Sequence, residues 1–295
     1  MRRWRAIVRA TALEIASDPL AYLITMSALA LAVLAPSMHY HQFGEPSRMA
    51  RDAGLSALLL GGLSHAVFSS VKAFRREIES GTMQMALAHS VSRASFFCAK
   101  LCGVLAAYLV FAATLASVML TMVNGAEIAG RISAETGAMV RVWGPSFSLA
   151  ASALVLPPIV AAALNRFARF RFTATATALS AVFAVAGAAY RFDVHLALRL
   201  APVALMLLLP PCAFAAAASA AAVRWRANAA LSACGVLFFL SLPLLGGYYL
   251  SDALSRGGRL PWFHFALAVA ATAPIVAAFA TAGVALLERR DVGGE

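Results

Sequence analysis

The sequence predicts an all-α, polytopic helical membrane protein, and three features of its composition support this. Of the 295 residues, 62% are hydrophobic and only 13% are charged, and the mean hydropathy is +0.80. A soluble domain carries about a quarter charged residues, so this chain has too few to cover a soluble surface. Disorder is excluded because disordered chains are poor in the apolar residues that dominate here.

Residues 1–18 are predicted to form an amphipathic cytoplasmic helix that lies in the membrane interface. Helical spacing separates a basic face from a largely apolar one. The basic face holds Arg2, Arg5 and Arg9, and the other face holds Trp4, Val8, Thr11 and Ile15. Asp18-Pro19 is expected to end this helix, because a residue before proline avoids the α conformation.

Residues 19–295 are predicted to form a single transmembrane domain of about eight spans. Each span needs roughly 20 apolar residues. The apolar segments are 20–36, 54–73, 96–123, 146–164, 172–190, 196–223, 228–250 and 262–287. The sixth contains Pro202, Pro210 and Pro211, and proline breaks or kinks helices. Six full spans plus a re-entrant pair within 172–223 is therefore the alternative.

Loop charge predicts that both termini are cytoplasmic. With an even number of spans and the N-terminus inside, the inner loops and tails receive most of the Lys and Arg residues. The inner groups include Arg75 and Arg76, then Arg166 and Arg169, and later Arg224 and Arg226. This bias also accounts for the net charge of +11, so no nucleic-acid partner is predicted.

The spans lack the residues of a membrane enzyme or an ion-coupled transporter. All acidic residues are expected in loops or tails, and His65, deep in a span, is expected to be a hydrogen-bonded packing residue. The sequence has no zinc-protease, serine-hydrolase or Walker A motif. His39 and His41 are interpreted as ordinary outer-loop residues, not metal ligands. The chain is therefore predicted to be no enzyme, to bind no cofactor or metal, and to draw energy from another polypeptide.

A cytoplasmic loop at 74–95 is the most informative segment. Its charged turn runs from Arg75 to Glu79, Gly81 lets the chain reverse, and Thr82 is placed to cap a new helix. Apolar residues then follow at helical spacing: Met83, Leu87 and Val91. Such an apolar face in an aqueous loop needs a partner surface, which is either another protein or the membrane domain itself.

This loop resembles the permease subunits of the type-two (ABC-2) family of ABC exporters. The similarity lies in the order E-x-E-x-G-T, apolar residues, then V-S-R-x-x-F-x-x-x-K. The matching residues are Glu77, Glu79, Gly81, Thr82, Leu87, Val91, Ser92, Arg93, Phe96 or Phe97, and Lys100. Ser90 replaces the proline usual before V-S-R, and eight segments exceed the six spans usual in the family. Segments 43–46 and 51–55 are similar to a subgroup of permeases linked to multicopper-enzyme maturation.

The resemblance implies a multi-pass subunit of an ATP-driven exporter in the bacterial cytoplasmic membrane. A dimer of a separate cytoplasmic ATPase would bind ATP and magnesium, and a second permease copy or paralogue would complete the pathway. The loop, with Met83 included, would transmit ATPase closure, with Glu79 at the contact and Arg93 and Lys100 at the lipid headgroups. The alternative is a membrane scaffold or assembly protein that binds a cytoplasmic partner through 77–93.

Overall fold

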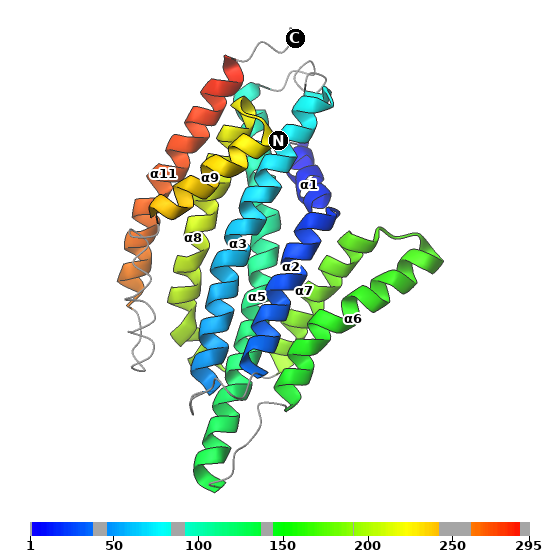
Figure 1. Cartoon of the computed structure of the whole chain (residues 1–295), viewed down its shortest axis with the longest axis vertical. Helices are drawn as coiled ribbons and strands as arrows, with labels where there is room; N and C mark the ends of the chain where they lie inside the picture. The colour runs from blue at the N-terminus through cyan, green and yellow to red at the C-terminus, as the bar shows by residue number, and fades with distance from the viewer. Residues whose placement is uncertain are drawn as a thin grey trace.

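The computed structural model describes residues 2–37, 46–83, 92–136, 144–190, 192–241 and 261–289, and within these ranges the chain is a bundle of helices without strands (Figure 1). The all-α prediction is confirmed for this part of the chain. The elements are α1 (Arg2–Ala16), α2 (Pro19–Leu34), the 3₁₀ turn η1 (Ala35–Ser37), α3 (Pro46–Glu79), α5 (Arg93–Thr136), α6 (Pro145–Ala168), α7 (Phe172–Tyr190), α8 (Val194–Arg224), α9 (Ala227–Ser241) and α11 (Trp262–Glu288).

Each of the eight predicted apolar segments overlaps a helix, although residues 242–250 of the seventh lie outside the described residues, and the helices differ in length. Within the described residues, six are long and apolar enough to cross a bilayer: α3, α5, α6, α7, α8 and α11. The count reaches seven if α1 and α2, which are bent by 64° at their junction, form one span. Because α2 has 16 residues and α9 has 15, full crossing by each of them alone stays a prediction.

The prolines of the sixth segment lie inside one continuous helix. Pro202, Pro210 and Pro211 all fall within α8, and α7 and α8 are each long and apolar enough to span; whether each crosses the bilayer fully or forms part of a re-entrant pair stays a prediction. Proline removes a backbone donor, and neighbouring helices compensate for that loss in membrane proteins. Tyr108 of α5 donates a hydroxyl hydrogen bond to the nearby carbonyl of Leu208 at 3.4 Å, whereas the carbonyls that Pro210 and Pro211 free are those of Met206 and Leu207.

The core lies where α3 contacts both α5 and α8. Gly61 and Gly62 of α3 make the close approach possible. A side chain at Gly61 would overlap Ala28 of α2, and one at Gly62 would press on Tyr108. Small residues at such crossings let helix backbones approach closely, which is how membrane helices associate without a hydrophobic driving force.

The N-terminal helix α1 packs against α5. Thr11 and Ile15 are 3% and 4% exposed, and Thr11 fits against Gly103 of α5. Arg5 and Arg9 on the other face are exposed. The amphipathic pattern of 1–18 is therefore present, with its apolar face turned toward protein along part of its length. Its place in the membrane interface stays a prediction.

Two parts of the bundle present apolar surface outward. The α6–α7 hairpin leans away from the other helices on one side, and α11 lies on the opposite side against α8 (Figure 1). Exposed apolar side chains on them include Val155 and Ile159 of α6 and Phe263 and Leu267 of α11. Apolar outward faces are what a lipid bilayer requires.

The helices extend beyond the predicted spans and carry acidic residues with them. The expectation that every acidic residue lies in a loop or tail is wrong, because Glu77 and Glu79 lie in α3 and Glu127 and Glu135 lie in α5. The reason is length, since α5 has 44 residues and its C-terminal end projects past the other helices (Figure 1). Hydropathy marks where a helix is apolar, not where its hydrogen bonding ends.

Candidate coupling site

The predicted turn after the second apolar segment is present in the structure. The last turn of α3 closes with an ion pair between Arg75 and Glu79 at 2.6 Å. The backbone N–H of Ser80 bonds the carbonyl of Arg76, and Gly81 follows with a φ of +69°. This left-handed conformation is one that glycine adopts without steric cost. Residues 82 and 83 are helical again, so α3 ends at this turn, while the reversal of the chain and the new helix beyond it lie outside the described residues and stay predictions.

Two residues of the motif, Glu77 and Lys100, meet inside the protein. The Lys100 ammonium lies 2.7 Å from a Glu77 carboxylate oxygen and donates to the carbonyl of Ala73 at 2.5 Å. It also lies 5.7 Å from the ring centre of Phe74. Lys100 is 0% exposed, so the expectation that it lies at the lipid headgroups is wrong. Its charge is compensated by the carboxylate, as burial demands.

Arg93 joins the start of α5 to the end of α11. Its guanidinium donates to the carbonyl oxygens of Leu287 and Glu288 at 3.1 and 2.7 Å. The last carbonyls of a helix lack intrahelical partners and carry partial negative charge, so a cation there is stabilising. Arg93 thus contacts a helix end, a partner that the sequence did not indicate.

Ser92 has a capping role that sequence reasoning missed. Its hydroxyl accepts a hydrogen bond from the backbone N–H of Ser95 at 3.2 Å, and its carbonyl accepts from that of Phe96. This is the N-cap arrangement at the start of α5. A serine directly before a helical apolar run was the available signal.

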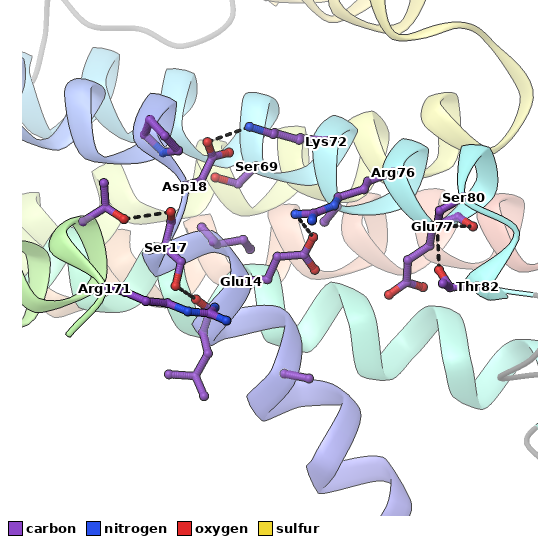
Figure 2. A pocket seen from close by; sticks show the side chains of 16 residues that line it. Glu14, Ser17, Asp18, Ser69, Lys72, Arg76, Glu77, Ser80, Thr82 and Arg171 are labelled. Atoms are coloured by element: carbon purple, nitrogen blue, oxygen red, sulfur yellow. Dashed lines mark hydrogen bonds and ion pairs between the residues drawn. The ribbon is translucent and has the colours of Figure 1, made fainter. Parts of the chain in front are cut away.

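The end of α3 is also tied to α1. Arg76 pairs with Glu14 at 3.0 Å, and Lys72 pairs with Asp18 at 2.6 Å (Figure 2). Asp18 in addition accepts the backbone N–H of Leu20 and so caps α2. None of these four charged residues was in the predicted site. Lys72 and Arg76 are spaced i, i+4 and lie on one face of α3, and the same spacing of Glu14 and Asp18, although Asp18 lies beyond the end of α1, could have indicated a matched contact.

A polar cavity of about 940 Å³ lies beside these pairs. It is lined by α1, the C-terminal half of α3, the Ser80–Thr82 turn and the start of α7, from which Arg171 and Thr173 contribute (Figure 2). The Thr173 hydroxyl donates to the carbonyl of Ser17 at 2.7 Å. The junction of α1 and α2 therefore contacts both α3 and α7 at this end of the bundle.

The remaining predicted site residues differ in how far they can be placed. Glu79 projects outward, with 61% of its side chain exposed. Met83 is 4% exposed and belongs to the core of the chain, so the first residue of the predicted apolar face packs on the membrane domain itself. Leu87 and Val91 lie outside the described residues, as do His39 and His41.

We define the coupling site as the last turns of α3, the Gly81 turn and the first turns of α5. Within the described residues it gathers Glu77, Glu79, Gly81, Thr82, Met83, Ser92, Arg93 and Lys100. Ion pairs and hydrogen bonds tie it to α1 and α11, while Glu79 faces outward. The site therefore lies at one end of a bundle of long apolar helices, which is the architecture of a polytopic membrane protein.

Comparison with known families agrees with this class. Residues 10–156, close to half of the chain, match the family described as ABC-2 family transporter protein. The matched stretch runs from α1 to α6 and contains the whole coupling site. The chain therefore belongs to the ABC-2 family and is a membrane permease component of an ABC transporter. Comparisons with curated proteins and with solved structures gave no match.

Proposed function

We propose that this chain is the permease subunit of an exporter that uses ATP hydrolysed by a separate cytoplasmic ATPase dimer. The coupling site would dock on that ATPase, and a second permease copy or paralogue would complete the pathway. The observation that carries the proposal is the contrast within the turn. Glu79 is exposed and available to a partner, whereas Glu77, Arg93 and Lys100 join the same turn to the bundle.

Charge supports a cytoplasmic position for this end of the bundle. Lys72 and Arg76 lie there on α3, and Arg171 contributes from the α6–α7 connection. Positively charged residues accumulate on the cytoplasmic side of membrane proteins. The coupling end would accordingly face the compartment that supplies ATP, in the cytoplasmic membrane of a bacterium.

The contacts suggest how ATPase closure would reach the spans. A push on the Gly81 turn would act on α3 directly, on α5 through Glu77 and Lys100, and on α1 through Arg76 and Glu14. Arg93 would carry the same movement to α11. The turn would thus move several helices together, as rigid-body rocking requires.

Charge reversal at Glu79 tests the docking. We expect Glu79→Lys to insert normally but to lose most of the stimulation of the partner ATPase, because a carboxylate that meets basic residues is replaced by a like charge. Measurements would be co-purification of the ATPase with the tagged chain and ATPase activity in nanodiscs. The matched control is Glu288→Lys, which reverses an exposed charge at the same end outside the turn.

Two outcomes would count against the proposal. Unchanged ATPase stimulation by Glu79→Lys would remove Glu79 from the docking contact. A folded, abundant chain that co-purifies with no ATPase would instead favour a scaffold or assembly protein. Scrambling residues 77–93 provides the positive control, because it should release any ATPase that is bound.

A further inference from the structure

A second cavity lies in the bend between α1 and α2. Its volume is about 280 Å³, and its walls come from α1, α2, α3, α5 and α7. Ala106, Ala107 and Val110 of α5 and Ala12 and Leu13 of α1 make most of the lining apolar. Small-molecule pockets of proteins begin at about 300 Å³ and are lined mainly by apolar groups with a few polar ones. The size and lining therefore suit a small, largely apolar ligand.

His65 of α3 is the polar group that stands out in this lining. It is 4% exposed, and its ring stacks on Phe111 with the ring centres 4.9 Å apart. Its Nδ1 atom is buried and has no hydrogen-bond partner among the described residues. The sequence predicted a hydrogen-bonded packing residue, and at Nδ1 that expectation is wrong. A buried polar atom without a partner is costly, so a ligand that reached Nδ1 after a rotation of the ring toward the cavity would bind favourably.

Tyr22, Thr25 and Thr177 also contribute hydroxyl groups to the lining, and the two threonines already use their donors. Thr25 donates to the carbonyl of Ala21 and Thr177 to that of Thr173, both at 2.8 Å. Their hydroxyl oxygens retain acceptor capacity toward a ligand. Arg9, the charged residue of the lining, is exposed at the surface of α1. A charged ligand group beside His65 would lose its hydration without gaining an opposite charge as a partner, which would disfavour binding.

We infer that this cavity binds a small uncharged amphiphile whose apolar body fills the space and whose single hydroxyl or amide group hydrogen-bonds Nδ1 of His65. A hydroxyl or amide both donates and accepts, so it satisfies Nδ1 in either tautomer of the neutral ring. The five helices of the lining converge at the junction that Asp18 and Lys72 hold together. The site is complete within one copy of the chain, and its occupation does not require the ATPase coupling proposed above.

Photolabelling in nanodiscs tests this site with octanol bearing a diazirine as the probe. We expect saturable labelling of Tyr22 and Thr177, which line the cavity from different helices. Unlabelled octanol should compete at least about fivefold better than octane, which lacks the hydroxyl and so forfeits one hydrogen bond. Octanoate at neutral pH should compete more weakly than octanol. Tighter binding of octanoate, or equal competition by octane, would overturn the inference.

Two variants test separately whether ligand binding depends on the hydrogen bond to His65 and on the open volume of the cavity. His65→Phe keeps a ring against Phe111 and should abolish the preference for octanol over octane, whereas Ala107→Leu should abolish labelling by filling the cavity. Ser64→Ala is the matched control, because the Ser64 hydroxyl bonds the carbonyl of Leu60 on the same helix. A retained octanol preference in His65→Phe, or labelling that is unsaturable and spread over outward residues such as Val182, would reject the site.

These results stand apart from the test of the coupling site. Labelling is measured on the chain alone, and each variant is first checked for normal insertion and an unchanged elution volume. A chain that binds octanol at His65 but recruits no ATPase would support the ligand cavity and contradict the proposed ATPase coupling. A chain that recruits the ATPase but gives no saturable labelling would support the ATPase coupling and contradict the ligand cavity.

Discussion

The two ends of the bundle are held together in different ways. At the coupling end, charged contacts join helices that are far apart in the sequence, from α1 to α11. At the far end, formed by the start of α3, the end of α5 and the start of α8, most described ion pairs lie within one helix. Examples are Arg48 with Asp52 and Arg131 with Glu127, each at 3.8 Å. Glu127 of α5 also pairs with Arg199 of α8, which joins two helices at this end.

This difference shows where the fold resists relative movement of its helices. Ion pairs within one helix support that helix but do not fix it to a neighbour. Pairs between helices fix their relative position, most strongly when they are buried. The coupling end should therefore move as a unit, and the far end leaves its helices freer to separate. Each of the following predictions tests that contrast, beginning with the largest effect.

Removing the buried ammonium should cause the greatest loss of stability. Lys100→Met removes a fully buried ammonium and leaves the Glu77 carboxylate, which is 26% exposed, without its partner, and we expect a loss of about 3 kcal/mol in the free energy of unfolding. Arg199→Met at the far end should cost about 1 kcal/mol, because that pair is partly exposed. Denaturant titration in detergent measures both. The double variant Lys100→Met with Glu77→Leu should recover most of the loss, and equal losses at the two ends would contradict the comparison.

Loss of the cap on α11 should come next. Arg93→Ala removes two charge-assisted hydrogen bonds to carbonyls, and we expect a loss of about 2 kcal/mol together with faster hydrogen exchange in the last turn of α11. Arg289→Ala is the matched control, because Arg289 follows the same helix end and is exposed. Equal exchange rates in the two variants would show that Arg93 does not fix α11.

Two glycines with open surroundings allow a paired comparison. At both Gly81 and Gly130 a new methyl group would have no neighbour within 4 Å among the described residues, but only Gly81 has a positive φ. Gly81→Ala should therefore destabilise the turn by about 1 kcal/mol, whereas Gly130→Ala, inside α5, should stabilise by up to about 1 kcal/mol. Thermal unfolding measures both, and a change of the same sign at both positions would contradict the assigned turn.

The smallest expected effect is the loss of the Asp193 cap at the start of α8 when the pH is lowered. The backbone N–H groups of Leu196 and His195 bond the Asp193 carboxylate and lower its pKa below the ordinary value. A lowered pKa in the folded state means that this cap is fully present above the unfolded value, about pH 4, and is lost as the pH falls through the folded one. Asp193→Asn should keep the cap and remove its pH dependence, measured by hydrogen exchange at the first turn of α8.

The sequence indicated the helices and the turn far better than the contacts between them. Apolar runs of sufficient length form helices in a membrane. Gly81 marks a turn because glycine adopts a positive φ without steric cost. The contact of Arg93 with Leu287 joins residues separated by 194 positions, and no local pattern predicts such a pairing. Lys100 was expected at the headgroups because a lysine near a span end commonly extends there. Its ion pair with Glu77 becomes visible only in the folded structure.

Span limits failed for a related reason. Hydropathy ended the third segment at residue 123, but α5 continues to Thr136 because helix propensity and hydrogen bonding do not stop where the apolar stretch ends. The prolines of α8 were expected to break or kink the sixth segment. A membrane helix with packed neighbours tolerates proline, and Pro202, Pro210 and Pro211 all lie inside the continuous helix α8.

The length and continuity of α3 and α5 have a mechanical consequence. Proline lies inside α6, α8 and α11, whereas α3 has proline only as its first residue and α5 has none. At about 1.5 Å per residue, the 44 residues of α5 form a rod of roughly 66 Å, about twice the thickness of the bilayer core. The two longest described helices, neither of them interrupted by proline, are thus the two that meet at the Gly81 turn. A small tilt imposed there is magnified by the length of the lever, and the largest excursion falls on the projecting tip beyond Glu127.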